Sequence, residues 1–203
     1  KGALRFDGTV DMLTGPLLPK LLIFSLPLMA SSVLQLLFNA ADVVVVGRYA
    51  SYASLAAVGS TTAIVNLVIN LLIGISVGVN VVIARYLGEG GREEDISAAV
   101  HTAVALALLG GILLGGVGCA ASGWMLRAVS TPADVYPLAL TYLYIYFAGT
   151  PAAAMYNYSV AALRARGDTQ RPLIFLAVSG VVNVILNLLF VISFHMEIGR
   201  AHV

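Results

Sequence analysis

The chain has 203 residues, of which 60% are hydrophobic and only 10% are charged, and its formal net charge is +1. Soluble domains carry about 25% charged residues, so this composition excludes an ordinary soluble protein. The mean hydropathy of +0.95 is typical of an integral membrane protein. The net charge gives no indication of nucleic-acid binding, and a single cysteine excludes an internal disulfide.

Five apolar stretches are long enough to cross a bilayer, which takes about 20 mostly apolar residues in a helix. None shows the strict alternation of a membrane β-strand, so the predicted fold class is all-α, a polytopic transmembrane helical bundle. Pro27 and Pro151 each remove a backbone hydrogen bond and predict bends in the first and fourth helices. The predicted spans are residues 17–46, 57–85, 96–126, 135–163 and 172–194.

Basic residues concentrate on one side of this topology. Eight of the 11 lie near the start of the first span, between the second and third spans, or between the fourth and fifth. Because cytoplasmic loops are rich in Lys and Arg, we expect a multi-pass protein of the cytoplasmic (inner) membrane with its N-terminus in the cytoplasm. The eight residues are Lys1, Arg5, Lys20, Arg85, Arg92, Arg164, Arg166 and Arg171.

In the first span, Asp42 is the one acidic residue, of ten in the chain, that falls within an apolar stretch. An Asp at the middle of a membrane helix costs roughly 2.5–3.5 kcal/mol, so such a group normally faces a cavity or a partner. Ser31, Gln35 and Asn39 precede it at helical spacing and form a polar stripe with it. Lys20 and Arg85 lie at the ends of their spans, and no Lys or Arg lies deeper in a span to form a buried ion pair with Asp42. We therefore expect Asp42 to be protonated or to hold a cation.

The second and fifth spans each carry asparagines along one face. Asn66, Asn70 and Asn80 of the second span fall within an arc of about 80°. Asn183 and Asn187 of the fifth span stack because they are four residues apart. Such side chains either join helices through hydrogen bonds worth about 0.6 kcal/mol each or line a cavity, and the sequence leaves both open for the second span.

Two glycine pairs have the GxxxG spacing that allows close helix packing, Gly74 with Gly78 and Gly111 with Gly115. The first pair also matches the G-x-S-x-G pattern of a hydrolase around Ser76. That nucleophile needs a strand, a sharp turn and a helix, whereas the pattern here lies within an apolar helix. We therefore predict helix packing and no enzyme.

Three features together carry a family resemblance: "FNAAD…G" at residues 38–47, "RARGDT…P" at residues 164–172, and the paired asparagines of the fifth span. On these, the chain resembles the N-terminal half of a multidrug and toxic compound extrusion (MATE) transporter of the bacterial branch, nearly end to end. The resemblance implies that residues 1–203 supply five helices of a six-helix first lobe. The sixth helix and a C-terminal lobe would be missing partners.

The resemblance also implies a function and a set of site residues. The protein would be a secondary antiporter that exports drugs or other amphipathic organic cations in exchange for protons or sodium ions. Asp42, Asn183 and Asn187 would form the cation-coupling site and a candidate sodium site, and Pro27 would mark a helix bend. Some members have a second carboxylate where Asn187 stands, which leaves the coupling ion open.

Beyond the coupling ion the resemblance implies no cofactor, and the expected partners are small-molecule substrates and membrane lipid. Aromatic faces suit cationic drugs through cation–π attraction, although tyrosines at this position also fit an interfacial belt. The candidate residues of the substrate cavity are Gln35, Asn39, Asn66, Asn70, Tyr156 and Asn157, with Tyr142 and Tyr146.

Two other functions are also compatible with the sequence. One is a lipid-linked glycan flippase of related architecture, whose cavity should hold several intramembrane Arg or Lys residues. The other is a non-transporting membrane scaffold or receptor in which Asp42 is only structural.

The last six residues, 198–203, can be encoded by ATCGGAAGAGCACACGTC, the start of a widely used sequencing adapter. We therefore expect a truncated reading frame that ends in adapter read-through. The alternative is a natural loop.

Overall fold

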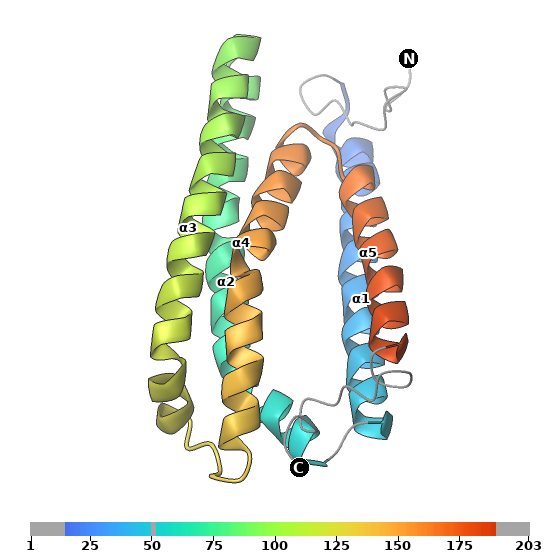
Figure 1. Cartoon of the computed structure of the whole chain (residues 1–203). Helices are drawn as coiled ribbons and strands as arrows, with labels where there is room; N and C mark the ends of the chain where they lie inside the picture. The colour runs from blue at the N-terminus through green and yellow to red at the C-terminus, as the bar shows by residue number, and fades with distance from the viewer. Residues whose placement is uncertain (1–14, 50–51, 190–203) are drawn as a thin grey trace.

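The structure is a computed structural model that describes residues 15–49 and 52–189, and the predicted spans are five α-helices in it (Figure 1). Most helices extend a few residues beyond the predicted spans, because polar and glycine residues at the ends continue the helical hydrogen bonds. The expected end of the fifth span at residue 194, and residues 198–203, lie outside the described residues. The helices are α1 (Leu17–Tyr49), α2 (Tyr52–Gly88), α3 (Glu93–Ala128), α4 (Tyr136–Ala165) and α5 (Gln170–Leu188).

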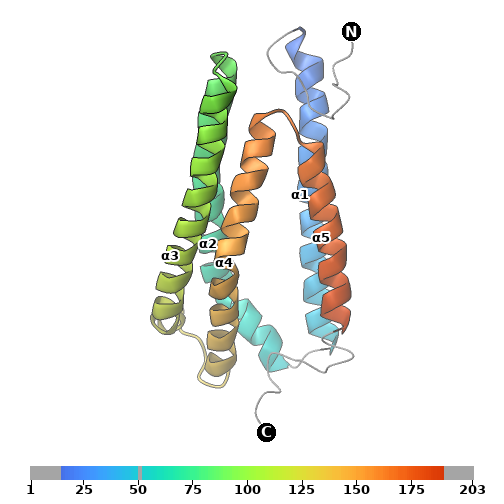
Figure 2. The same ribbon diagram turned by 45° about the horizontal axis from the view of Figure 1, so that its top comes forward.

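The helices fall into two groups. α2, α3 and α4 pack together, whereas α1 packs mainly on α5, from which the other three helices separate it in sequence. Both ribbon views show α1 and α5 side by side and apart from the other three (Figures 1 and 2). One end of the bundle, here called the basic end, holds the starts of α1, α3 and α5 and the ends of α2 and α4. Its described basic residues are Lys20, Arg85, Arg92, Arg164, Arg166 and Arg171.

Glycines of α3 let it approach the bend region of α4. A Cβ atom built on Gly111 would lie 2.6 Å from the Cα atom of Pro151, and one on Gly115 would lie 2.6 Å from the carbonyl oxygen of Phe147. Because Pro151 has no N–H, that carbonyl, four residues earlier, lacks its usual helical donor. Only glycine allows α3 so close to it, and the predicted packing of Gly111 and Gly115 is confirmed.

The packing prediction for the other glycine pair is wrong within the part of the chain that the structure describes. No described atom lies within 4 Å of a Cβ built on Gly74 or Gly78. The spacing is the same in both pairs, but α2 turns a different face, with Ala57, Ile64 and Val68, toward its neighbours. GxxxG spacing therefore allows another helix to pack closely, but it does not determine whether a helix lies there.

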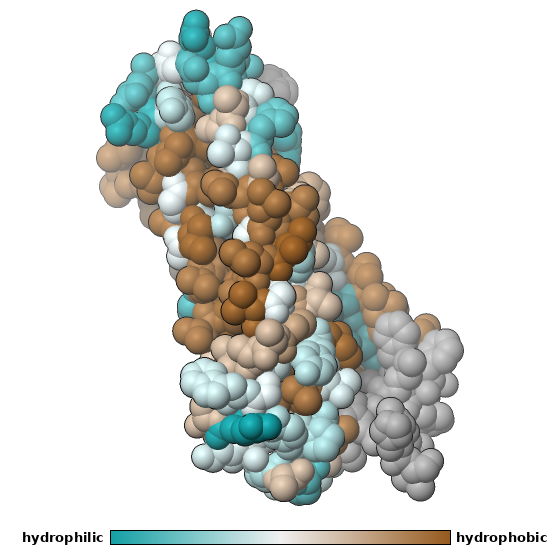
Figure 3. All heavy atoms as spheres, turned by 60° about the vertical axis from the view of Figure 1, so that its left-hand side comes forward, coloured by the Kyte–Doolittle hydropathy of each residue, from teal (hydrophilic) through white to brown (hydrophobic). Residues whose placement is uncertain are grey.

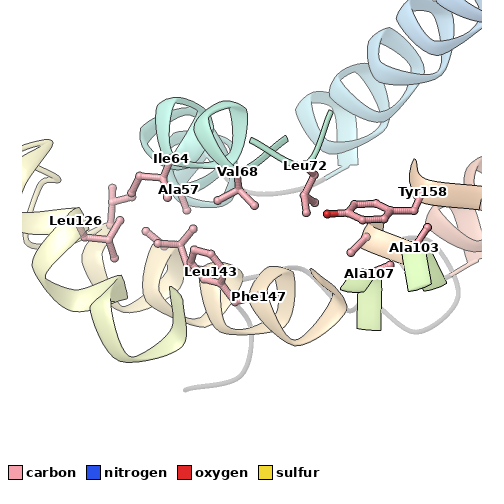
Figure 4. Close-up of a cluster of buried hydrophobic side chains, with 13 residues drawn as sticks. Ala57, Ile64, Val68, Leu72, Ala103, Ala107, Leu126, Leu143, Phe147 and Tyr158 are labelled. Atoms are coloured by element: carbon pink, nitrogen blue, oxygen red, sulfur yellow. The ribbon is translucent and has the colours of Figure 1, made fainter. Parts of the chain in front are cut away.

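The buried core lies between α2, α3 and α4. Leu143 and Phe147 of α4 face Ile64 and Val68 of α2, while Tyr158 lies between Leu72 and α3 (Figure 4). Lipid is as apolar as these side chains, so the core is stabilised by close van der Waals packing more than by removal from water.

The outer surface of the helices is apolar. A broad hydrophobic band covers the middle of the face shown in Figure 3, and hydrophilic residues gather beyond it toward the ends. Large side chains such as Leu109 and Leu113 of α3 are exposed by 65% and 69%. All five helices are long and apolar enough to cross a membrane, and α3, with 36 residues, is about 54 Å long. Its ends therefore pass beyond a hydrocarbon core of about 30 Å.

Candidate functional site

The polar residues of α1 and α5 meet in a chain of hydrogen bonds. The Asn187 amide nitrogen donates to Oδ1 of Asp42 at 2.7 Å and to Oδ1 of Asn183 at 3.0 Å. Asp42 and Asn187 are half-buried, whereas Asn183 is exposed. The structure thus brings the three residues of the predicted cation site together, and the hydrogen bond between Asp42 and Asn187 joins residues that are 145 positions apart in sequence.

The described side chains include no basic group that neutralises the charge of Asp42. Among the described residues, no Lys, Arg or His lies within 4 Å of its carboxylate as an ion pair. Tyr142 of α4 is close enough to Asp42 to interact with it electrostatically. A carboxylate inside a membrane span normally faces a cavity or a partner.

Asn187 already uses both of its amide protons, one on each neighbour. Its own oxygen, the second oxygen of Asp42 and the oxygen of Asn183 remain as acceptor sites. An oxygen-only set of this kind suits a hard cation such as sodium, provided that the Asn187 amide turns to present its oxygen. A proton on Asp42 is the other way in which the site can hold one positive charge.

A cavity of about 280 Å³ lies between the two helix groups, on the basic-end side of Asp42. Three of the predicted substrate residues, Gln35, Tyr156 and Asn157, line it. Gln35 precedes Asp42 by seven residues, which is about 10 Å along the helix axis. The full lining is Ser31, Ser32, Gln35, Ile73, Ser76, Val77, Asn80, Tyr156, Asn157, Val160, Ala161, Arg164 and Leu176.

The structure does not bring the other five predicted substrate residues into this lining. Tyr142 and Tyr146 are half-buried and pack against the core of α2, α3 and α4. Asn39, Asn66 and Asn70 are all exposed. Asn39 lies on α1 between Gln35 and Asp42, and the Asn70 amide donates to the Asn66 carbonyl of its own helix at 2.8 Å. Asn66 and Asn70 share a face of α2 with the cavity residue Ile73, one to two turns farther from the basic end.

Asn80 has both of the functions that the sequence left open for the second span. Its amide donates to the Ala161 carbonyl of α4 at 3.0 Å, and it also lines the cavity. Ser76, the serine of the hydrolase-like pattern, donates to the Ile73 carbonyl of its own helix at 2.7 Å. It is therefore part of a continuous helix and not of a strand-turn-helix elbow.

The expectation that no basic residue reaches into a span needs correction at Arg164. The predicted fourth span ends at residue 163, but α4 continues to Ala165, so Arg164 belongs to the last helical turn. Its side chain lines the cavity, and its Nε atom is fully buried without a hydrogen-bond partner among the described residues. By hydropathy alone Arg164 is a loop charge, and only a shift of the predicted helix end by two residues places it in α4.

Pro27 lies inside α1, which continues as one helix on both sides of it. The Ser31 hydroxyl donates to the Pro27 carbonyl at 2.8 Å, and Ser32 donates to the Leu28 carbonyl at 3.1 Å. Because Pro27 has no N–H, the Ile23 carbonyl lacks its helical donor. α1 therefore lacks one backbone hydrogen bond next to Pro27, about four turns before Asp42.

Comparison with known proteins identifies the family. A family model described as MatE matches residues 27–189, which is most of the chain. The chain belongs to the MATE family.

The relatives of this MATE chain include bacterial proteins named for multidrug resistance. It is 31% identical to the probable multidrug resistance protein YpnP of Bacillus subtilis (strain 168). The match extends over 193 residues and covers 94% of this chain and 43% of that protein. It is also 27% identical to the probable multidrug resistance protein NorM of Thermotoga maritima (strain ATCC 43589 / DSM 3109 / JCM 10099 / NBRC 100826 / MSB8). That match extends over 168 residues and covers 83% of this chain and 36% of that protein.

A solved structure agrees with the fold. The outward-facing conformation of a multidrug resistance MATE family transporter of the MOP superfamily matches with a TM-score of 0.79 at 25% identity, over 86% of this chain and 38% of that one. The chain therefore spans less than half the length of the proteins it matches. Members of the family are transporters and not enzymes, and the five helices make this chain a multi-pass membrane protein.

Proposed function

We propose that the chain forms five helices of the N-terminal lobe of a secondary antiporter. The complete protein exports drugs or other amphipathic organic cations in exchange for protons or sodium ions. The observation that carries the proposal is the hydrogen bond from Asn187 to Asp42, because it joins α1 to α5 through a carboxylate that has no basic partner in the part of the chain that the structure describes. The family membership and the cavity beside this pair support the same function.

Cation binding acts on the contact between α1 and α5. A proton on Asp42 removes the negative charge that the Asn187 amide binds, and a hydrogen bond to a neutral acceptor is roughly half as strong as one to a carboxylate. A sodium ion instead draws the oxygens of Asp42, Asn183 and Asn187 inward, which requires the Asn187 amide to turn. Either event changes how α1 sits on α5.

α1 carries this change to the substrate. It holds Asp42 and, about 10 Å away along the same helix, the cavity residue Gln35. A movement of α1 relative to α4 alters the cavity between Gln35 and Asn157, so cation and drug favour different arrangements of the lobe. Such a difference in affinity between two states is what a ligand needs to drive a conformational change.

The proposal includes a topology and a partner. The basic end lies in the cytoplasm, as the excess of Lys and Arg there predicts, and the protein resides in the cytoplasmic membrane. A second lobe completes the transporter, because secondary transporters of this kind work by rocking two repeats against each other around a site near the membrane midplane.

A lipid-linked glycan flippase is the second candidate, and Arg164 is the observation that favours it. One basic side chain in the cavity is, however, fewer than the several expected for an anionic head group. A scaffold or receptor remains the third candidate, and it requires no ion-dependent movement of drug.

Efflux by the complete protein in membrane vesicles tests the proposal. Rhodamine 123 transport should follow an imposed proton or sodium gradient in the wild type and be lost in Asp42→Asn, which should still insert. Asp134→Asn is the matched control, because Asp134 is an exposed acid in the loop before α4, and it should transport normally. Wild-type rates in Asp42→Asn would refute the coupling role. Absence of any gradient-driven efflux together with movement of a lipid-linked glycan would favour the flippase.

A further inference from the structure

A hollow of about 290 Å³ lies between α3 and α4 near the basic end, and it shares no residue with the cavity between the two helix groups. Ala103 and Tyr158 are buried in it, whereas Val104 and Arg166 are exposed. Because α3 has no contact with α1 or α5, the hollow opens on the outer surface of the bundle. We call it the α3–α4 groove, and its other lining residues are Val100, Ser159, Ala162 and Leu163.

The groove follows from the way in which α3 crosses α4. The two helices are closest at Gly111 and Gly115, where an added Cβ atom would meet the backbone of α4 at 2.6 Å. Helices that cross at an angle separate on either side of the crossing. Ala103 lies eight residues before Gly111, about 12 Å nearer the basic end, and its small side chain and that of Ala162 leave the widening space unfilled.

The groove lies at the depth where the head groups of a bilayer begin. Trp124, near the other end of α3, is 72% exposed, and exposed Trp side chains are enriched at membrane interfaces. Val100 is about 36 Å from Trp124 along the helix axis, slightly more than a hydrocarbon core of about 30 Å. Exposed apolar side chains such as Leu109 and Leu113 lie between them. Arg166, which lines the groove together with Val100, is therefore at the level of the lipid phosphates.

Arg166 is the one charged residue in the described lining of the groove, and it forms no ion pair within the described residues. The acids nearest to it in sequence and on α3 have other partners. Asp168 is 1% exposed, and its carboxylate lies 3.2 Å from Nε of Arg171. Asp95, in the first turn of α3, lies 3.5 Å from Nε of Arg92. The positive charge at the groove therefore has no counter-charge from the part of the chain that the structure describes.

The charge of the groove selects among the lipids that can lie beside it. Its apolar walls suit an acyl chain, and the guanidinium of Arg166 suits a phosphate, because two parallel N–H donors match two oxygens. A zwitterionic head group brings an ammonium as well, and the described lining offers no acid to bind it. An anionic head group brings no such charge, and basic pockets between membrane helices at the cytoplasmic side bind lipids of this kind.

We propose that the α3–α4 groove binds a phospholipid with a net negative head group, taken from the leaflet at the basic end. One acyl chain lies along Ala103 and Ala162, and the phosphate binds to Arg166. The site is separate from the cavity and from Asp42, so it depends on neither the substrate nor the coupling ion.

The test is photocrosslinking of the complete protein in dodecyl maltoside with a phosphatidylglycerol that carries a diazirine in one acyl chain. The crosslinked peptides are identified by mass spectrometry. Labelling should include residues 100–104 or 158–166. Excess dioleoylphosphatidylglycerol should suppress it at a lower concentration than dioleoylphosphatidylcholine, which has the same acyl chains.

Three variants separate the charge from the shape of the groove. Arg166→Gln should raise the concentration of the photoreactive lipid needed for half-maximal labelling about 5-fold. Arg85→Gln is the matched control, because Arg85 is an exposed arginine of the same end that pairs with Glu89 and does not line the groove, and it should label as the wild type does. Ala162→Leu fills the groove without changing the charge and should also weaken labelling there.

Arg166 also follows the last residue of α4, where a basic side chain is favourable to the helix dipole. If that were its whole function, Arg166→Gln would lower the thermal stability of the protein and leave the labelling and the preference between the two lipids unchanged.

Several outcomes would overturn the inference. Absence of labelling at residues 100–104 and 158–166 would mean that another part of the complete protein covers the groove. Equal suppression by the two lipids would remove the selection for negative charge. Wild-type labelling in Arg166→Gln, or an equal loss in Arg85→Gln, would remove the assignment to Arg166. If Ala162→Leu does not fold, the comparison of the two arginine variants decides alone.

Discussion

The close contact of α3 with α4 can be tested with two glycine pairs of identical spacing. The double variant Gly111→Ala/Gly115→Ala adds a Cβ at 2.6 Å from a backbone atom of α4 at both positions, whereas ordinary contacts begin at 3.4 Å. The helices must therefore separate by about 0.8 Å, since backbone atoms cannot swing aside as a side chain can. Overpacking of this kind costs about 1–3 kcal/mol per site.

The control is Gly74→Ala/Gly78→Ala, whose added methyl groups meet no described atom within 4 Å. Both double variants gain the same helix propensity, about 1 kcal/mol per residue, and the same restriction of the unfolded chain. These contributions cancel in the comparison. The free energy of unfolding of the α3 variant should then be about 2–6 kcal/mol below that of the control.

The free energies are measured by titration with sodium dodecyl sulfate from dodecyl maltoside micelles, followed by circular dichroism. The α3 variant should unfold at a lower fraction of dodecyl sulfate than the wild type, and the control should not. Equal midpoints for the two double variants would refute the contact of Gly111 and Gly115 with α4.

Other regions give further predictions. Asn80→Ala removes the hydrogen bond to Ala161 and should lower the free energy of unfolding by about 0.6 kcal/mol, whereas Asn70→Ala, whose amide bonds its own helix, should not; equal losses would contradict this. In a Cys119→Ala background, a cysteine at Glu89 should be protected from an impermeant maleimide in intact cells and one at Asp134 should be labelled, and the reverse pattern would invert the topology. Residues 1–203 alone should confer no drug resistance although the complete protein does, because one lobe cannot rock against a partner that is missing; resistance from the chain alone would overturn this.

Hydropathy was enough to predict the number, type and approximate limits of the helices, since membrane spans need long apolar stretches. Helical spacing also predicted correctly that Asn183 and Asn187 would be neighbours, which their hydrogen bond of 3.0 Å confirms. Both are local properties of one helix. Local patterns are read directly from the order of residues, without knowing which helix lies beside which.

These local patterns do not predict which helix packs against which. Nothing in the spacing indicates that Asn187 meets Asp42, because the partner is chosen by how α5 packs on α1. The two GxxxG pairs have the same spacing in the sequence, yet within the described residues only Gly111 and Gly115 lie close against another helix.

The position of a helix end decides whether Arg164 is assigned to a loop or to the helix. Hydropathy ended the fourth span at residue 163 because a charged residue follows, whereas the backbone continues to Ala165. A side chain as long as that of arginine then reaches back along apolar surface, in this case into the cavity. Window averages of hydropathy cannot detect this, because they score the charge and not its direction.

The most direct test of the coupling role of Asp42 is the dependence of drug affinity on the coupling ion. The dissociation constant of rhodamine 123 for the complete protein is measured across pH and sodium concentration, in the wild type and in Asp42→Asn. If a cation at Asp42 and drug in the cavity favour different states of the lobe, linkage requires the wild-type constant to change with one of these ions, typically by about 5- to 150-fold, and the Asp42→Asn constant to stay flat. An Asp42→Asn protein whose affinity follows pH or sodium as the wild type does would contradict the account.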